Sequence, residues 1–177
     1  MNPNQTAVFP GVITEPAAWD ASAIGGKAGV THTLSQPELS ALARLLEKSR
    51  RRPTEQLTRA DLAIPELEGP VRSIRHQIMH GSGVVIVSGV TRELFAVEDF
   101  ERLFWGIGVQ LGVPAVQNAQ GHRIGHVRCE ADNPRNRGYM SDRELGFHSD
   151  AFETVGLMCV ANGRSGGLSR IVSSLTV

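Results

Sequence analysis

The amino-acid sequence predicts an α+β fold in which the helices lie before Pro114 and most of the strands lie after it. Leucines recur at helical spacing shortly after Ser35, and residues 84–87 form an unbroken β-branched run. After Pro114 the sequence changes to short apolar pieces separated by loops rich in Gly, Asn and Arg. Helices and strands that occupy separate parts of a chain are typical of α+β folds. With 177 residues, the chain is long enough to form one sizeable domain.

The first 33 residues are expected to form an irregular N-terminal arm, because they mix Pro, Gly, Ala, Ser and Thr without a sustained apolar period. Residues 34–177 are expected to form the domain. Its first helix starts at a capping box, Ser35-Gln36-Pro37-Glu38, which can satisfy backbone N–H groups at the start of a helix. The helix then presents one apolar face, made of Leu39, Leu42, Leu45 and Leu46.

The remaining elements follow from the same patterns. Apolar residues at helical spacing predict a second helix over residues 70–80, which Gly81 ends. The β-branched run predicts a strand over residues 83–90 that is buried on both faces. A third helix is predicted over residues 97–111, and strands are predicted over residues 155–160 and 168–172. Residues 117–146 carry few large apolar side chains, which is typical of a functional loop.

The charge balance and the hydropathy pattern exclude several classes of partner. Lys and Arg number 18, Asp and Glu also number 18, and the net charge of zero argues against coating a nucleic acid. No apolar run approaches the 18 residues of a membrane-spanning helix, and no secretory signal is visible. We therefore expect a cytoplasmic protein without nucleic-acid or membrane partners, in which Cys129 and Cys159 stay reduced.

The tetrapeptide Phe147-His148-Ser149-Asp150 is the clearest candidate for chemistry. In an extended segment residues i and i+2 project to the same side, so the imidazole of His148 and the carboxylate of Asp150 can converge on one point. Non-haem iron oxygenases bind iron(II) through two histidines and one carboxylate, which leaves coordination positions open. The tetrapeptide alone leaves a plain alternative, a surface histidine beside a turn aspartate.

Further motifs accompany this tetrapeptide between residues 81 and 174. In chain order they are Gly83-Val84-Val85-Ile86-Val87-Ser88-Gly89, Trp105-Gly106-Ile107-Gly108 with Leu111-Gly112, Gln117-Asn118, Gly125-His126-Val127-Arg128, Arg137-Gly138-Tyr139, Phe147-His148-Ser149-Asp150, Val155-Gly156-Leu157, and Gly166-Gly167-Leu168-Ser169-Arg170-Ile171-Val172-Ser173-Ser174. In this order and spacing they resemble the taurine-dioxygenase-like (TauD/TfdA) superfamily of iron(II)- and 2-oxoglutarate-dependent dioxygenases.

The resemblance implies a double-stranded β-helix, or jelly roll, of the clavaminate synthase-like kind, flanked by the N-terminal helices. It implies that His148 and Asp150 are the first two iron ligands. Ser169 matches the hydroxyl residue that helps to hold the far carboxylate of the co-substrate 2-oxoglutarate. The implied activity is hydroxylation of a C–H bond in a small molecule, which consumes dioxygen and decarboxylates 2-oxoglutarate.

The resemblance also points to a substrate side of the site. Gln117, Asn118 and Arg128 lie in the segment that approaches the substrate in the family. An ion pair with Glu130 or Asp132 is an equally weighted alternative role for Arg128.

The family pattern requires a second iron-binding histidine and an arginine downstream of Ser169, whereas every other histidine here precedes His148. We therefore expect the N-terminal part of a dioxygenase, with a jelly roll that is incomplete at its C-terminus. One alternative is a non-catalytic module that associates with itself or with a partner through exposed strand edges. A cupin-like metal-binding protein that does not use 2-oxoglutarate is a further alternative.

Overall fold

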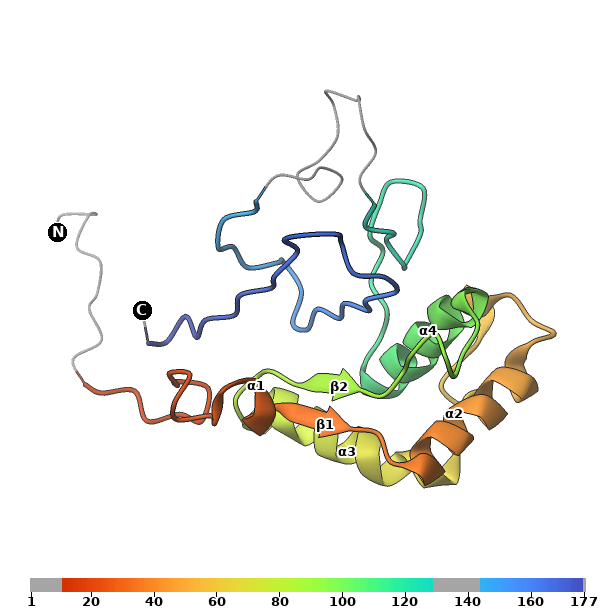
Figure 1. The fold of residues 1–177 in the computed structure, drawn as a ribbon, viewed down its shortest axis with the longest axis horizontal. Helices are drawn as coiled ribbons and strands as arrows, with labels where there is room; N and C mark the ends of the chain where they lie inside the picture. Colours follow the sequence, from red (N-terminus) through yellow and green to blue (C-terminus); the bar gives the residue numbers. More distant parts are fainter. Residues whose placement is uncertain (1–10, 129–143, 177) are drawn as a thin grey trace, which may run out of the picture.

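The computed structural model describes residues 11–128 and 144–176. Along the chain, its elements are α1 (Gly26–Gly29), β1 (Thr31–Thr33), α2 (Gln36–Ser49), η1 (Thr54–Gln56), α3 (Pro65–His80), β2 (Ile86–Ser88), η2 (Val97–Asp99) and α4 (Phe100–Leu111). Helices α2, α3 and α4 pack together beside the β1–β2 pair, and the chain after α4 runs above them without regular structure (Figure 1). None of the helices in the described ranges is long and apolar enough to cross a membrane.

Helix α2 confirms the predicted capping box. The Glu38 carboxylate accepts hydrogen bonds from the backbone N–H of Ser35, at 2.6 Å, and from the Ser35 hydroxyl. The apolar face of α2 then enters the core, where Leu42 and Leu45 are fully buried together with Leu62 and Leu103. Burial of that face against α3 and α4 supplies most of the stability of the helix, since isolated helices of this length are marginal in water.

Helix α3 starts five residues earlier than predicted, at Pro65 instead of Pro70. Pro65 occupies a first-turn position, where a missing N–H costs nothing, and Glu66 and Glu68 carry the negative charge that the helix start favours. Pro70 therefore lies inside the helix and does not begin it. The predicted end is correct, because Gly81 caps α3 through a hydrogen bond from its N–H to the carbonyl oxygen of Gln77.

The predicted irregular arm, residues 1–33, contains regular structure that the sequence did not reveal. Helix α1 lies within it, and β1 pairs in parallel with β2, with Thr31 opposite Ile86 and Thr33 opposite Ser88. Strand β1 was missed because Thr-His-Thr has neither an apolar run nor an alternating pattern. Strand β2 is shorter than the predicted 83–90, because a strand extends only as far as its partner, and β1 has three residues.

The predicted helix over residues 97–111 is confirmed with one refinement, since its first turn is the 3-10 helix η2 and α4 follows. Inside the core the indole N–H of Trp105 donates to the carbonyl oxygen of Leu57, at 2.8 Å. Next to it, Gly106 lets α4 approach the side chain of Leu45 on α2. These contacts fix α4 against the first half of the chain.

The predicted strands over residues 155–160 and 168–172 are wrong for this structure, which assigns no strand to either segment. A strand requires a neighbour to pair with, and neither segment has a strand partner among the described residues. Most of their large apolar side chains are exposed, including Leu157 and Leu168. The sheet of the described residues is thus the β1–β2 pair, and the expected jelly roll is not formed in them.

Candidate functional site

His148 and Asp150 lie in an exposed, irregular segment that begins at residue 144 of the described chain. The Nδ1 atom of His148 lies 2.8 Å from the carbonyl oxygen of Gly146. A carbonyl oxygen can only accept a hydrogen bond, so Nδ1 is the donor in this contact, and in a neutral imidazole with that tautomer Nε2 keeps its lone pair. This is the arrangement in which metal-binding histidines are usually held, with one ring nitrogen donating to a carbonyl and the other available to a metal.

Ser169 is exposed and follows a glycine turn. Gly166 and Gly167 both have left-handed backbone angles, with φ values of 72° and 69°, which residues with a Cβ rarely adopt. This turn directs the chain into the segment that carries Ser169. An ion pair between Arg170 and Glu144, with 3.2 Å between Nη2 and Oε1, joins that segment to the one that carries His148. The segments that carry His148 and Ser169 are therefore in contact at this ion pair.

Gln117 and Asn118 lie in a tight turn after α4. The Asn118 side-chain oxygen accepts hydrogen bonds from the backbone N–H groups of Gln120 and His122, both at 3.1 Å. The Gln117 side-chain amide donates to the carbonyl oxygen of Ala115, at 3.2 Å. Both side chains thus stabilise the turn, and the substrate-side role expected of them remains a prediction.

Residues 121–128 lead from this turn towards Arg128, and two contacts hold them to the helical half of the chain. The backbone N–H of Arg123 donates to the carboxylate of Glu55 in η1, at 3.3 Å. The His126 Nε2 atom lies 3.1 Å from Oε2 of Glu101 on α4. Arg128 itself is exposed.

Other expectations fall on residues outside the described ranges. The possible ion-pair partners of Arg128, Glu130 and Asp132, are among them, as is Cys129. Cys159 is an exposed free thiol that donates to the Asn162 side-chain oxygen, at 3.3 Å. The expectation that both cysteines stay reduced remains a prediction, because Cys129 lies outside the described residues.

The described residues include the two candidate iron ligands, His148 and Asp150, and their role as a pair stays a prediction. No group of three or more His, Cys, Asp or Glu side chains in residues 11–128 and 144–176 could hold a metal ion. The donor set fits part of an iron(II) site, because the Nε2 of His148 and the carboxylate of Asp150 are suitable nitrogen and oxygen ligands. Sequence reasoning identified both residues but missed Gly146, whose carbonyl orients the imidazole, because a backbone acceptor leaves no signal in residue identity.

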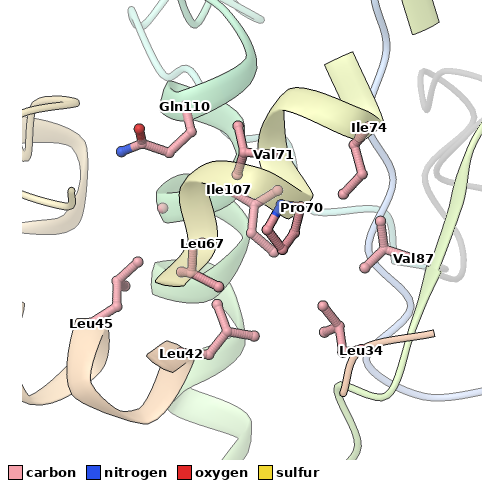
Figure 2. Close-up of a pocket in the computed structure, with 11 residues that line it drawn as sticks. Leu34, Leu42, Leu45, Leu67, Pro70, Val71, Ile74, Val87, Ile107 and Gln110 are labelled. Atoms are coloured by element: carbon pink, nitrogen blue, oxygen red, sulfur yellow. The ribbon is translucent and has the colours of Figure 1, made fainter. Parts of the chain in front are cut away.

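Two hollows lie away from these residues. The first is a cavity of about 20 Å³ between α2, α3, α4 and β2, lined mostly by aliphatic side chains that point inwards, such as Leu42, Leu67 and Ile107 (Figure 2). It is a packing gap, too small for a substrate. The second is a surface hollow of about 380 Å³, bounded by residues 90–93 and 159–162. None of the six predicted site residues lines either one.

Comparisons with known proteins agree with the resemblance. The model of the taurine catabolism dioxygenase TauD, TfdA family matches residues 35–177. FR-33289 synthase of Streptomyces rubellomurinus (strain ATCC 31215) is 27% identical over 174 residues, which cover 93% of this chain and 50% of that protein. The chain thus spans about half the length of this curated relative. Since the family match covers most of the sequence, the chain belongs to the TauD/TfdA family of dioxygenases.

Proposed function

We propose that this chain provides the first part of the active site of an iron(II)- and 2-oxoglutarate-dependent oxygenase that hydroxylates a small molecule. The family match supports this proposal, and it includes His148, Asp150 and Ser169. The observation that carries it is the hydrogen bond from His148 Nδ1 to the carbonyl of Gly146, which favours the tautomer that leaves Nε2 available to a metal. When bound, iron and 2-oxoglutarate would supply the oxidising chemistry.

In this proposal each residue of the chain has a separate task. The Nε2 atom of His148 and the carboxylate of Asp150 bind iron(II), and the Ser169 hydroxyl donates to the far carboxylate of 2-oxoglutarate. The Glu144–Arg170 ion pair is a contact between the iron-binding segment and the segment of Ser169. Being exposed, this pair contributes little energy, so it does not by itself hold the two segments in place.

The proposal places the remaining iron ligand and the carboxylate-binding arginine outside these 177 residues. No histidine follows His148 in this sequence, and the relative extends for about as many residues again as this chain covers. Gln117, Asn118 and Arg128 are assigned to the substrate side. We assign a small-molecule substrate, because the metal and its co-substrate supply the chemistry and the protein only has to bind and orient the substrate.

Metal binding tests this proposal. Under anaerobic conditions, the chain with iron(II) and 2-oxoglutarate is expected to develop a weak visible charge-transfer band, and His148→Ala is expected to remove it. His80→Ala is the matched control, because it also removes an imidazole but His80 lies at the end of α3, beside His76, and is not one of the predicted site residues. The proposal fails if the band is absent from the parent chain, or if His148→Ala and His80→Ala behave alike.

A second candidate function is supported by the exposed apolar side chains after residue 144. Leu157 is 78% exposed and Leu168 is 87% exposed, and neither segment pairs with a strand among the described residues. Such segments favour association by strand pairing. A non-catalytic module of this kind would associate without iron or 2-oxoglutarate, so sedimentation with and without both ligands separates the two functions.

A further inference from the structure

Trp19 connects three segments that are far apart in the sequence. Its side chain is only 9% exposed, and its indole N–H donates to the carbonyl oxygen of Ser82, at 2.7 Å. Its own carbonyl oxygen accepts a hydrogen bond from the Thr176 hydroxyl, at 2.8 Å. The two partners are 63 and 157 residues away. One residue of the N-terminal arm therefore contacts both the loop before β2 and the last described residues.

Ser173 makes a second contact between the same two ends of the chain. Its hydroxyl donates to the carbonyl oxygen of Ala17, at 2.6 Å, and accepts from the backbone N–H of Leu175, at 3.2 Å. Ser173 is 6% exposed, and it is the one buried residue within the described range 144–176. A buried hydroxyl with both roles satisfied indicates a specific contact, because removing it would leave the Ala17 carbonyl without its partner.

The N-terminal arm is ordered at the point where these contacts form. The Asp20 carboxylate accepts hydrogen bonds from the backbone N–H groups of Ser22 and Ala23, both at 2.8 Å, and from the Ser22 hydroxyl. These bonds lower the pKa of Asp20 below its ordinary value, and the bond from the Ser22 hydroxyl has the largest effect. They also hold the turn that follows Trp19. On the other side, the Gln77 amide donates to the Ser82 hydroxyl, at 3.0 Å, so the acceptor of the indole is itself anchored to α3.

We propose that residues 15–24 form a clasp that holds residues 168–176 against the helical half of the protein. Trp19 and Ser173 are its positioning residues. Ser169 lies four residues before Ser173, so the clasp would set the position of the hydroxyl assigned to 2-oxoglutarate. Only this last step rests on the proposed function, because the clasp itself depends on contacts between residues of this chain.

Hydrogen exchange followed by mass spectrometry tests the clasp directly. Ser173→Ala is expected to speed exchange about 5- to 30-fold in the peptides that contain residues 15–24 and 171–176, since the carbonyl of the half-buried Ala17 loses its hydrogen-bond donor. Trp19→Phe keeps an aromatic ring but removes the indole N–H, and it is expected to speed exchange in residues 171–176. Ser174→Ala is the matched control, because Ser174 is exposed.

Exchange within α2 reports whether a variant still folds, because α2 contributes to the core. The expected result is normal protection in α2 together with faster exchange at both ends of the clasp. The clasp is overturned if Ser173→Ala leaves residues 15–24 as protected as Ser174→Ala does. If Ser173→Ala does not fold, Trp19→Phe and Thr176→Val carry the test. Trp19→Phe removes the indole donor to Ser82, and Thr176→Val removes the hydroxyl that donates to the carbonyl oxygens of Trp19 and Ser173.

A ligand titration separates the clasp from the proposed function. Under anaerobic conditions with iron(II), 2-oxoglutarate is expected to slow exchange in residues 168–176 of the parent chain. Ser173→Ala is expected to require about 5- to 30-fold more 2-oxoglutarate for the same protection. If 2-oxoglutarate does not slow exchange in the parent, while the variants still exchange faster in residues 15–24 and 171–176, the proposed function fails and the clasp is supported. If the ligand protects the parent and Ser173→Ala equally, the positioning role is overturned.

Discussion

A Cβ atom added to Gly106 would lie 3.1 Å from both terminal methyl carbons of Leu45. Gly106 is buried on α4, and Leu45 is 1% exposed at the centre of the face that α2 turns to the core. The missing side chain thus allows close contact between two helices that are joined by 50 residues of intervening chain. The same helix contains Gly108, where an added Cβ would meet no atom within 4 Å.

These two glycines should respond to alanine in opposite directions. Gly108→Ala is expected to stabilise the protein by about 0.5–1 kcal/mol, because alanine is a better helix former than glycine. Gly106→Ala is expected to destabilise it by about 1–3 kcal/mol, because the added Cβ would press on Leu45, and the cavity of about 20 Å³ that both residues line is too small to take up a displaced leucine side chain. Urea unfolding followed by circular dichroism measures both effects, and equal shifts in the two variants would contradict this account of the helix contact.

Stability should also depend on pH through Glu38. Burial alone would raise the pKa of this carboxyl, but hydrogen bonds from the Ser35 hydroxyl, from the Ser35 backbone and from His32, 3.0 Å away, together lower it. Because the pKa is lower in the folded state, the stabilisation is present above the unfolded value of about 4.3 and is lost as the pH falls towards the folded value. Glu38→Gln is expected to flatten the dependence of unfolding free energy between about pH 5 and pH 3.

At neutral pH, Glu38→Gln is expected to cost about 1 kcal/mol, the usual cost of weakening a helix cap. Glu66→Gln is the control, because Glu66 is an exposed carboxylate that pairs with Arg44 at 2.7 Å on the protein surface. Its effect should be much smaller. A parent protein whose stability falls no more steeply below pH 5 than that of Glu38→Gln would contradict the prediction.

Trp105→Phe tests the buried hydrogen bond between α4 and the chain before α3. The variant keeps an aromatic ring in the core but leaves the carbonyl of Leu57 without the indole N–H as its donor. We expect a loss of about 1–3 kcal/mol in the free energy of unfolding. Val113→Ala provides the baseline, because Val113 is 96% exposed and such substitutions usually change stability by less than about 0.5 kcal/mol. Equal denaturation midpoints would refute the role of this bond.

The exposed apolar side chains predict concentration-dependent self-association. Leu168→Asp and Leu157→Asp each place a charge in a segment that is exposed and unpaired in this structure, so both should weaken association without disturbing the helical core. Analytical ultracentrifugation over a range of protein concentrations measures this. Val12→Asp is the control, since Val12 is exposed in the N-terminal arm. If all three variants associate as strongly as each other, the segments of Leu157 and Leu168 do not mediate self-association and the prediction is wrong.

Sequence reasoning succeeded for several features whose signal was local. The capping box of Ser35 and Glu38, the apolar stripe of α2 and the end of α3 at Gly81 depend on neighbours within one or two turns, and all are found in the structure. Strand β1 was not predicted, because it is stabilised by pairing with β2, which is more than 50 residues away. The sequence Thr-His-Thr itself shows no periodic pattern that would indicate a strand. Conversely, residues 155–160 have a strand-like composition but no strand partner among the described residues.

The candidate site follows the same division. His148 and Asp150 could be proposed as iron ligands from the sequence, because their residue types, their spacing and the neighbouring motifs can all be read there. The carbonyl of Gly146 and the ion pair between Glu144 and Arg170 could not, since both depend on how the backbone turns between residues of ordinary composition. The contact of Ser173 with Ala17 was equally hidden, because it joins residues 156 positions apart.

The parallel pairing of β1 with β2 imposes an order on events during synthesis. The Ser88 hydroxyl donates to the Thr33 hydroxyl at 3.0 Å across 55 residues, so β1 leaves the ribosome long before its partner exists. Helices α2 and α3 are complete by then, and their packing shortens the distance that the chain must close. Until β2 has been made, the side chains of the unpaired β1 are two hydroxyls and one imidazole, so β1 exposes no large apolar side chain to other chains. A strand too polar to be recognised in the sequence is therefore well suited to remain unpaired while the rest of the fold is made.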